Sequence, residues 1–447
     1  MIQELTEVKV TELWQYLAKG GASLTTVDER ILRVVYPGRP SDEPGADFKD
    51  AVLSIGGQMT KGDIEIHVRS SDWRKHRHHR DSAYNGIVLH VVMWHDAEDT
   101  TCLENGCSVP VISLDNQKTM AVTQIEKKPS LPYCAGSTGG ISEEKILDVL
   151  DCAGEARFRE KQSVFCRELE YADAGQCLYR GVMGALGYSR NTVPFQIVAE
   201  QLPLASLESM VKETPEESAL VRLEALLLGT AGFLPSQALS TLSPNCDDAW
   251  IQAVQREWHV NEHKSALSPI NWRLFRVRPG NFPARRLAGM ARLLWQYRKR
   301  GFLAGLVELV KQTSQNDGWH QVEAGLMVTA DGYWADRFDL GKRCQGLDKF
   351  LIGRSRAKEI IVNVLLPFIA ASGERNYQMG IWEKAFALYC NYPVATENTI
   401  ERHMRTQLGV KRALVNSARR QQGLLHLYKR FCTQGRCGEC LVLNNGY

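Results

Sequence analysis

The segment Asp63-Ile64-Glu65-Ile66-His67-Val68-Arg69 decides the fold expected for the first third of the chain. Its odd positions are ionisable and its even positions are β-branched. Because side chains of a strand alternate between its two faces, this pattern predicts a strand whose apolar residues face a core. Asp63, Glu65 and His67 would then share the opposite face. Two carboxylates and an imidazole aligned in this way indicate a candidate metal or acid–base site. An ordinary solvated strand face is the alternative.

Histidines are concentrated around this strand. Six of the eleven fall between residues 62 and 96, namely His67, His76, His78, His79, His90 and His95. Residues 70–85 are too polar for a strand and long for a hairpin loop, and long polar connections are often functional. Four cations (Arg74, Lys75, Arg77 and Arg80) alternate with the histidines there. We therefore expect His76, His78, His79 and Asp81 to contact an anionic substrate rather than to chelate a metal as a whole cluster, with the addition of ligands to the strand's metal site as one alternative. A solvated polar loop is the other alternative.

His90 lies among apolar residues in the next predicted strand, 87–94. We expect a buried histidine that pairs with a strand neighbour. If residues 70–85 bring this strand back beside the first, His90 would face Glu65 or His67 instead.

The remaining periodicity predicts a mixed fold. A helix is expected at 6–18, with strands at 31–36, 51–55, 63–69, 87–94 and 109–114, and with turns at Gly56-Gly57 and Lys61-Gly62. From about residue 142 the pattern becomes helical. The predicted class is α+β or α/β. Residues 1–140 would form a mixed β-sheet catalytic domain, 141–420 an α-helical domain with a basic surface, and 421–447 a cysteine-bearing tail packed on the helical domain.

The tail contains a second candidate metal site. Its pattern is His426-x5-Cys432-x4-Cys437-x2-Cys440. A Cys-x2-Cys pair with a third cysteine nearby favours Zn²⁺, and an Fe–S cluster ranks second. His426, Cys390 and Cys344 are candidates for the fourth ligand. Ordinary reduced thiols are the alternative.

Charge is unevenly distributed along the chain although the net charge is only +3. Residues 263–307 contain ten Lys or Arg and no acid, and residues 402–436 contain nine and no acid. Such blocks suit a polyanion such as nucleic acid, while solvated helix faces are the alternative. Arg278 and Arg285 flank a rigid Pro-Gly turn and are placed to frame an anion.

Several classes are disfavoured. The sequence has no nucleotide-binding glycine motif and no Gly-x-Ser-x-Gly elbow. No secretory signal opens the chain, and the longest apolar run, 360–371, is too short to span a bilayer. Twelve cysteines without dense spacing suit a reducing cytosol. We expect a cytoplasmic protein without a membrane partner.

Separated motifs resemble a bacterial family, domain of unknown function 2851. They begin with Gly62–His67, Ser71-Asp72-Trp73 and the histidine segment, and they continue through 178–191, 226–234, 278–287 and 421–440. The likeness covers nearly the whole chain. The family carries no established activity that could be transferred.

Strands 51–55 and 63–67 also resemble the core of the PD-(D/E)xK nuclease fold. That resemblance implies an Asp near one strand and Glu-x-Lys on the next, with the carboxylates binding Mg²⁺ or Mn²⁺. Asp50 or Asp63 would supply the Asp, and Glu65 the Glu. His67 stands at the Lys position, which is a departure, because imidazole is largely neutral at pH 7 and shifts metal preference toward Mn²⁺, Fe²⁺ or Zn²⁺.

The expected function is metal-dependent processing of nucleic acid by phosphodiester hydrolysis. Asp63 and Glu65 would bind the metal, and His67 would position or deprotonate water. A non-catalytic nucleic-acid-binding or scaffold protein is the main alternative. A metalloenzyme for a small molecule is the third possibility, favoured by a deep apolar pocket over the strand.

Overall fold

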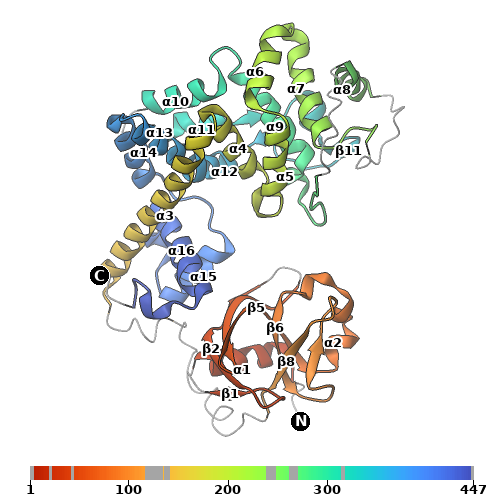
Figure 1. Cartoon of the computed structure of the whole chain (residues 1–447), viewed down its shortest axis with the longest axis vertical. Helices are drawn as coiled ribbons and strands as arrows, with labels where there is room; N and C mark the ends of the chain where they lie inside the picture. Colours follow the sequence, from red (N-terminus) through yellow and green to blue (C-terminus); the bar gives the residue numbers. More distant parts are fainter. Residues whose placement is uncertain are drawn as a thin grey trace. The chain divides into compact units, whose positions relative to one another are not determined.

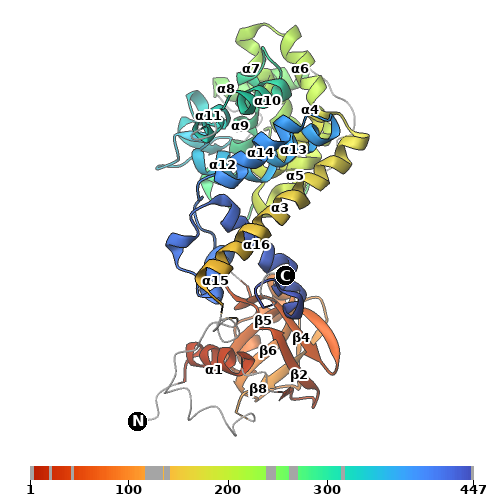
Figure 2. The ribbon, with the colours of Figure 1, turned by 90° about the vertical axis from the view of Figure 1, so that its left-hand side faces the viewer.

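The computed structural model describes residues 5–19, 23–41, 45–115, 134, 141–237, 248–260, 270–313 and 318–443. The chain separates into two compact units, whose elements are labelled in Figures 1 and 2. Unit 1 comprises Met1–Gly154, Glu397–Asn416 and Arg420–Tyr447. Unit 2 comprises Glu155–Thr396 and Ser417–Arg419. The predicted segments 1–140, 141–420 and 421–447 thus differ from the compact units, since the C-terminal segment groups with the sheet.

Unit 1 is built on a mixed sheet with strand order β1-β2-β4-β5-β6-β8-β7 and with β3 paired to β4. The strands are β1 (Leu24–Thr25), β2 (Ile31–Tyr36), β3 (Arg39–Pro40), β4 (Phe48–Ile55), β5 (Gln58–Arg69), β6 (Ile87–Trp94), β7 (Thr100–Cys102) and β8 (Ser108–Ser113). β2, β4 and β5 form an antiparallel meander, while β6 is parallel to β5 and β8 is parallel to β6. The predicted N-terminal mixed sheet with a larger helical region after it is confirmed.

The β4–β5 hairpin is longer than predicted. The two strands begin at Phe48 and Gln58 and meet at the Gly56-Gly57 turn, where both residues have positive φ (58° and 84°). Glycine is favoured there because it has no Cβ. The turn predicted at Lys61-Gly62 is wrong, because these residues pair with β4 inside the hairpin. The first residues of β5 are largely polar and lack the apolar alternation from which strands were predicted.

Helix α1 (Glu7–Lys19) packs against one face of this sheet. Leu13 and Trp14 of the helix belong to the same buried cluster as Ile64 and Ile66 of β5. Fully burying one such side chain contributes about 1.5–3 kcal/mol. This packing holds β5 in register and confirms the predicted alternation, because Glu65 and its neighbour His67 are left for the other face.

The connection between β5 and β6 crosses the second face. It contains helix α2 (Asp72–Lys75) and the 3-10 turns η1 (His78–Arg80) and η2 (Ser82–Tyr84). The parallel pairing of β5 with β6 requires such a crossover rather than a hairpin loop. Trp73 of α2 is buried with Ile87 and Leu103 in a small apolar cluster, which anchors the connection to the sheet.

The C-terminal elements of unit 1 pack against strands β2 and β4. They are α15 (Thr399–Leu408), η7 (Arg412–Leu414), most of α16 (Ala418–Arg430), η8 (Cys432–Gln434) and η9 (Cys437–Glu439). Leu427 and Tyr428 of α16 share a buried cluster with Tyr36, Val52 and Leu150. Leu150 lies in the first part of α3 (Glu143–Tyr171), a helix that begins in unit 1 and continues into unit 2.

Gly423 lies directly against the backbone of α3. A Cβ at this position would be 2.1 Å from the carbonyl oxygen of Leu150, which cannot yield as the tip of a side chain does. We expect Gly423→Ala to lower the free energy of unfolding by about 1–3 kcal/mol, measured by chemical denaturation. Gly438→Ala is the control, because nothing lies within 4 Å of its Cβ. Equal effects of the two substitutions would contradict the close helix contact.

Unit 2 is mainly helical. Its helices are α4 (Ala174–Leu186), α5 (Tyr188–Gln201), α6 (Leu204–Glu213), α7 (Glu216–Thr230), α8 (Ala249–Val260), α9 (Pro283–Gln296), α10 (Phe302–Gln312), α11 (Trp319–Leu326), α12 (Arg354–Ile360), α13 (Leu366–Arg375) and α14 (Met379–Asn391). Strand β9 (Val328–Thr329) pairs with β12 (Phe350–Ile352), and β10 (Arg337–Asp339) pairs with β11 (Lys342–Arg343). Among the residues that the structure describes, no helix combines the length and apolar character needed to cross a membrane.

Candidate metal centre

His67 lies at the centre of a histidine cluster on the polar face of β5. It is 1% exposed, its Nδ1 is 2.9 Å from His90 Nε2, and its Nε2 is 3.2 Å from His76 Nδ1. One ligand atom from each of His67, His76 and His78 lies within 4.8 Å of the others. In the described part of the chain, no other group of three His, Cys, Asp or Glu side chains has this spacing. Two of the loop histidines, which were expected to contact an anion, thus lie beside the strand with the geometry of a metal site.

Glu65 faces the same nitrogen atoms. Its Oε1 is 3.5 Å from His78 Nε2 and 3.7 Å from His67 Nε2. Its Oε2 accepts a hydrogen bond from the backbone N–H of Asp47 at 3.2 Å. Burial, and then the neighbouring carboxylate of Asp47, raise the pKa of Glu65 to about 9. A buried carboxylate with a raised pKa is one that a cation would strongly ionise.

The imidazoles are held in the neutral form. Burial and the adjacent histidines lower the pKa of His67 to about 2 and that of His90 to about 3. Burial also lowers the pKa of His78. A neutral imidazole offers a lone pair, which is the form that binds metal.

A hydrogen-bond chain fixes which nitrogen of His67 carries its proton. His90 Nδ1 is 2.8 Å from the Thr101 hydroxyl oxygen, and His90 Nε2 faces His67 Nδ1. When His67 Nδ1–H donates to His90 and His90 Nδ1–H donates to Thr101, Nε2 of His67 is left with its lone pair toward His76 and His78. This tautomer is assigned from the network. Metal-binding histidines are typically oriented by such outer partners.

Trp73 and Arg77 position the two loop histidines. The Trp73 ring contacts the rings of His78 and His67 at centroid distances of 5.3 and 6.4 Å, and its indole N–H donates to the Cys102 carbonyl at 3.1 Å. Arg77 has a left-handed backbone, φ 64°, between α2 and η1. That conformation is uncommon outside glycine and is concentrated at functional sites. It turns the chain so that His76 and His78, on either side, both reach His67.

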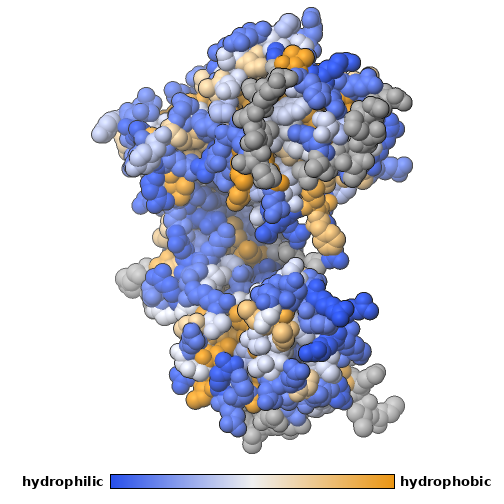
Figure 3. Space-filling view, turned by 45° about the vertical axis from the view of Figure 1, so that its right-hand side comes forward, coloured by the Kyte–Doolittle hydropathy of each residue, from blue (hydrophilic) through white to orange (hydrophobic). Residues whose placement is uncertain are grey.

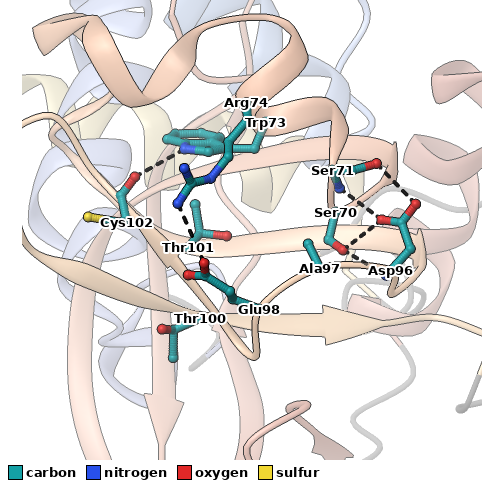
Figure 4. Close-up of a pocket in the computed structure, with 10 residues that line it drawn as sticks. All are labelled: Ser70, Ser71, Trp73, Arg74, Asp96, Ala97, Glu98, Thr100, Thr101 and Cys102. Carbon is teal, nitrogen blue, oxygen red and sulfur yellow. Dashed lines mark hydrogen bonds and ion pairs between the residues drawn. The ribbon is translucent and has the colours of Figure 1, made fainter.

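Unit 1 contains a pocket of about 540 Å³, whose lining residues are drawn in Figure 4. Its lining consists of Ser70, Ser71, Trp73, Arg74, Asp96, Ala97, Glu98, Thr100, Thr101 and Cys102. Asp96 accepts hydrogen bonds from the Ser70 hydroxyl and the Ser71 backbone N–H. Neither Glu65 nor any of the histidines is among these lining residues. Trp73, which contacts His67 and His78, and Thr101, which contacts His90, connect the pocket to the cluster.

The two other predicted carboxylate ligands have different contacts. Asp63 accepts hydrogen bonds from Lys49 Nζ at 2.7 Å and from the Asp50 backbone N–H at 3.2 Å. Asp50 accepts a hydrogen bond from the Tyr428 hydroxyl at 2.5 Å and has a left-handed backbone, φ 62°. These contacts stabilise the irregular pairing between Phe48 and Ala51. They do not bring either carboxylate to the histidines.

Asp47 was missed from the sequence. It directly precedes β4, its Oδ2 accepts a hydrogen bond from the Ile66 backbone N–H at 2.9 Å, and burial raises the pKa of its carboxyl group. Because the strand was expected to begin at Ala51, Asp47 was not placed beside Glu65. If the strand had been predicted to begin at Phe48, the acidic residue just before it would have been placed beside Glu65.

The remaining predicted residues occupy varied environments. Asp81 caps η2 by accepting from the Ala83 backbone N–H, and His79 lies in η1 outside the three-histidine group. Arg278 is exposed. Arg285 is fully buried and donates to the carbonyls of Trp334, Arg337 and Asp348, so its charge braces unit 2. In unit 1, His426, Cys432 and Cys440 are buried and Cys437 is half-buried.

Comparison with known proteins identifies a family and no activity. The profile of a family described as protein of unknown function (DUF2851) matches residues 7–398. No curated protein matches the chain, and no solved structure matches it. The matched region contains the sheet, the histidine cluster and nearly all of unit 2. The chain therefore belongs to the DUF2851 family, as its separated motifs indicated.

Proposed function

We propose that the cluster of His67, His76, His78 and Glu65 binds a divalent transition metal and supports hydrolysis of phosphodiester bonds in nucleic acid. The observation that carries this proposal is the convergence of three imidazoles and one carboxylate on the space beside His67 Nε2. Imidazole favours Zn²⁺, Mn²⁺ or Fe²⁺, whereas Mg²⁺ prefers oxygen ligands. The donor set thus shifts the expected metal away from Mg²⁺.

Exposed cations around the cluster support a phosphate substrate. Arg74, Lys75, Arg77 and Arg80 are all exposed, and they belong to the same connection as His76 and His78. Figure 3 shows strongly hydrophilic residues gathered on the side of the sheet-bearing body where Figure 1 places α2. Guanidinium and ammonium groups bind phosphate through charge-assisted hydrogen bonds. A nucleic-acid backbone would bring several such phosphates.

The two basic blocks contribute less than their charge suggests. Arg285 and Arg286 of the first block are buried, and residues 263–269 of that block lie outside the described residues. In the second block, Arg405 pairs with Glu397 and Arg420 with Asp151. The side chains of Arg405 and Arg420 are only 21% and 20% exposed, so a phosphate cannot reach them readily. Arg74 and Lys75 also have acidic partners, Glu98 and Asp72, but their side chains are 67% and 76% exposed. The proposal therefore rests on the histidine-bearing connection.

The placement of acidic residues supports the nuclease comparison. Asp47 precedes β4, and Glu65-Ile66-His67 lies on β5, which is similar to the Asp and Glu-x-Lys arrangement of the PD-(D/E)xK resemblance except that His67 stands at the Lys position. Asp47 takes the place that Asp50 or Asp63 was expected to fill. His67 has both ring nitrogens in contact with other histidines. We therefore assign it to holding metal rather than to deprotonating water.

The residues have distinct roles in this proposal. A bound metal would lower the pKa of a coordinated water and neutralise phosphate charge. Glu65 and the three histidines would hold it, and His90 would orient His67. Arg74 and Arg77 would position the phosphate backbone at the mouth of the site.

The test is cleavage of DNA and RNA by the purified protein supplied with Mn²⁺ or Zn²⁺. We expect cleavage by the wild type, none with a chelator, and only background cleavage by Glu65→Ala. His95→Ala is the matched control, because His95 lies outside the three-histidine group. Cleavage by Glu65→Ala at the wild-type rate would refute the assignment. Salt-sensitive binding without turnover in any metal would favour the non-catalytic alternative.

A further inference from the structure

Four cysteines from two distant parts of the chain meet in unit 1. Cys432 and Cys440 are buried members of the cluster that also contains Tyr36, and Cys134 packs against the same cluster. Cys437, which lies between Cys432 and Cys440 in the sequence, is half-buried. Cys134 was not among the predicted partners of the tail. Cys134 is therefore a candidate for the fourth sulfur ligand, which the three tail cysteines alone do not provide.

Helix α15 brings Cys134 and Cys432 to one place. Cys432 Sγ is 3.9 Å from Met404 Sδ, and the Gln407 side-chain amide donates to Cys134 Sγ at 3.1 Å. Met404 and Gln407 are three residues apart, so they lie on the same face of the helix. The two sulfurs therefore approach the same short stretch of α15.

Two tight turns fold the chain between Cys432 and Cys440. Gly435, with φ 67°, reverses the chain after Cys432, and its N–H donates to the Cys432 carbonyl at 3.1 Å. The Cys440 N–H donates to the Cys437 carbonyl at 3.1 Å across η9. Left-handed backbone at residue 435 favours glycine. The segment that contains the three tail cysteines is therefore compact.

The four thiols are close enough to affect one another. Burial raises the pKa of the Cys432 thiol, and Cys134, Cys440 and Cys437 raise it further because their negative charges would repel. Burial likewise raises the pKa of Cys134 to about 11, with Cys440 and Cys437 adding to the effect.

We propose that Cys134, Cys432, Cys437 and Cys440 bind an iron–sulfur cluster. A single Zn²⁺ with Zn–S bonds of about 2.3 Å in a tetrahedron would hold its sulfur ligands roughly 3.8 Å apart. Among the described residues, no three of these sulfurs lie within 4.8 Å of one another. A cluster with several irons and sulfides separates its cysteine ligands more widely. The wider spacing reverses the preference for Zn²⁺ expected from the tail alone.

The same geometry replaces the predicted fourth ligands. Cys390 and Cys344 belong to unit 2, and His426 lies within α16 with its ring against Phe431. The Gln407 amide adds an N–H···S hydrogen bond, and such bonds tune the potential of iron–sulfur clusters. The inference is independent of the histidine centre.

The test uses the full chain, purified without oxygen and reconstituted with ferrous iron and sulfide. We expect iron and acid-labile sulfide in comparable amounts, with visible absorption that bleaches on reduction. Cys134→Ser and Cys432→Ser should each lose most of the bound iron and sulfide. Cys390→Ser is the matched control and should keep both, as should His426→Ala.

Several results would overturn the proposal. They are wild-type protein without bound iron and sulfide after reconstitution, stoichiometric zinc without sulfide, or full iron and sulfide in Cys134→Ser. Because Cys134→Ser risks misfolding, circular dichroism is recorded for each variant, and the wild-type stoichiometry decides independently of any variant. His78→Ala should retain the cluster, so failure of the nuclease proposal is distinguishable from failure of this one.

Discussion

Glu65→Gln should make the metal-free protein more stable at pH 8 by roughly 3–5 kcal/mol while weakening its metal binding. The cause is the buried carboxyl group, whose pKa is raised to about 9 by burial and by Asp47. In the unfolded chain this group ionises near its usual pKa, about 4.3. Folding at pH 8 must therefore keep a proton that the unfolded chain has released.

The sign follows from proton binding in the two states. Below pH 4 both states are protonated, and Glu65 imposes no cost. As pH rises from about 4.5 to 9, the unfolded state releases the proton first, and stability falls by about 1.4 kcal/mol per pH unit. Gln cannot ionise, so the variant escapes this loss, while its side-chain oxygen still accepts the Asp47 N–H. The gain should vanish at pH 4 and grow toward pH 9.

Metal should reverse the ranking of the two proteins. A cation that binds only the folded wild type adds stability by mass action. Glu65→Gln removes a proposed ligand, so its metal affinity should fall by more than the roughly 10- to 100-fold typical of an outer partner. Chemical denaturation at several pH values, with chelator and with Mn²⁺ or Zn²⁺, measures both effects.

Glu98→Gln is the control for this comparison. The Glu98 side chain is 76% exposed, so its replacement should change neither the stability nor the metal affinity appreciably. If Glu65→Gln behaved like this control at pH 8 in chelator, the burial argument would be refuted. If it retained wild-type metal affinity, Glu65 would not be a ligand.

Local patterns predicted the strand and its polar face, because alternation depends only on neighbours in sequence. Glu65 and His67 could be placed together for this reason. Asp47 could not, since its position depends on the irregular β4–β5 pairing. Likewise, nothing local to the tail indicated Cys134, which reaches Gln407 through tertiary packing. Contacts between distant segments were the part that sequence periodicity could not supply.

The loop histidines illustrate the same limit within one segment. Their number indicated a site, but the sequence did not separate His76 and His78 from His79. The separation comes from the left-handed backbone at Arg77 and from Trp73 packing, which direct two of the three rings toward His67. A non-glycine residue with positive φ has no strong sequence signal.

His90→Leu should weaken metal binding roughly 10- to 100-fold although His90 is not a proposed ligand. His90 is fully buried, and its Nε2 lies 2.9 Å from His67 Nδ1. Leucine would leave that N–H unpaired in the core, at a cost of about 1–3 kcal/mol. His67 would then relieve the cost by moving its proton to Nε2, where it would block the lone pair that faces His76 and His78.

His90→Gln separates this positioning role from a merely structural one. The glutamine side chain offers a carbonyl oxygen that can accept from His67 Nδ1–H, so metal affinity should recover substantially relative to His90→Leu. Thr101→Val removes the next hydrogen bond, between Thr101 and His90, and should weaken metal binding by a smaller factor. Affinity is measured by competition with a chelator on samples shown to be folded by circular dichroism. Equal affinities of the Leu and Gln variants would refute the tautomer argument, because a general packing defect does not depend on whether the replacement can accept a hydrogen bond.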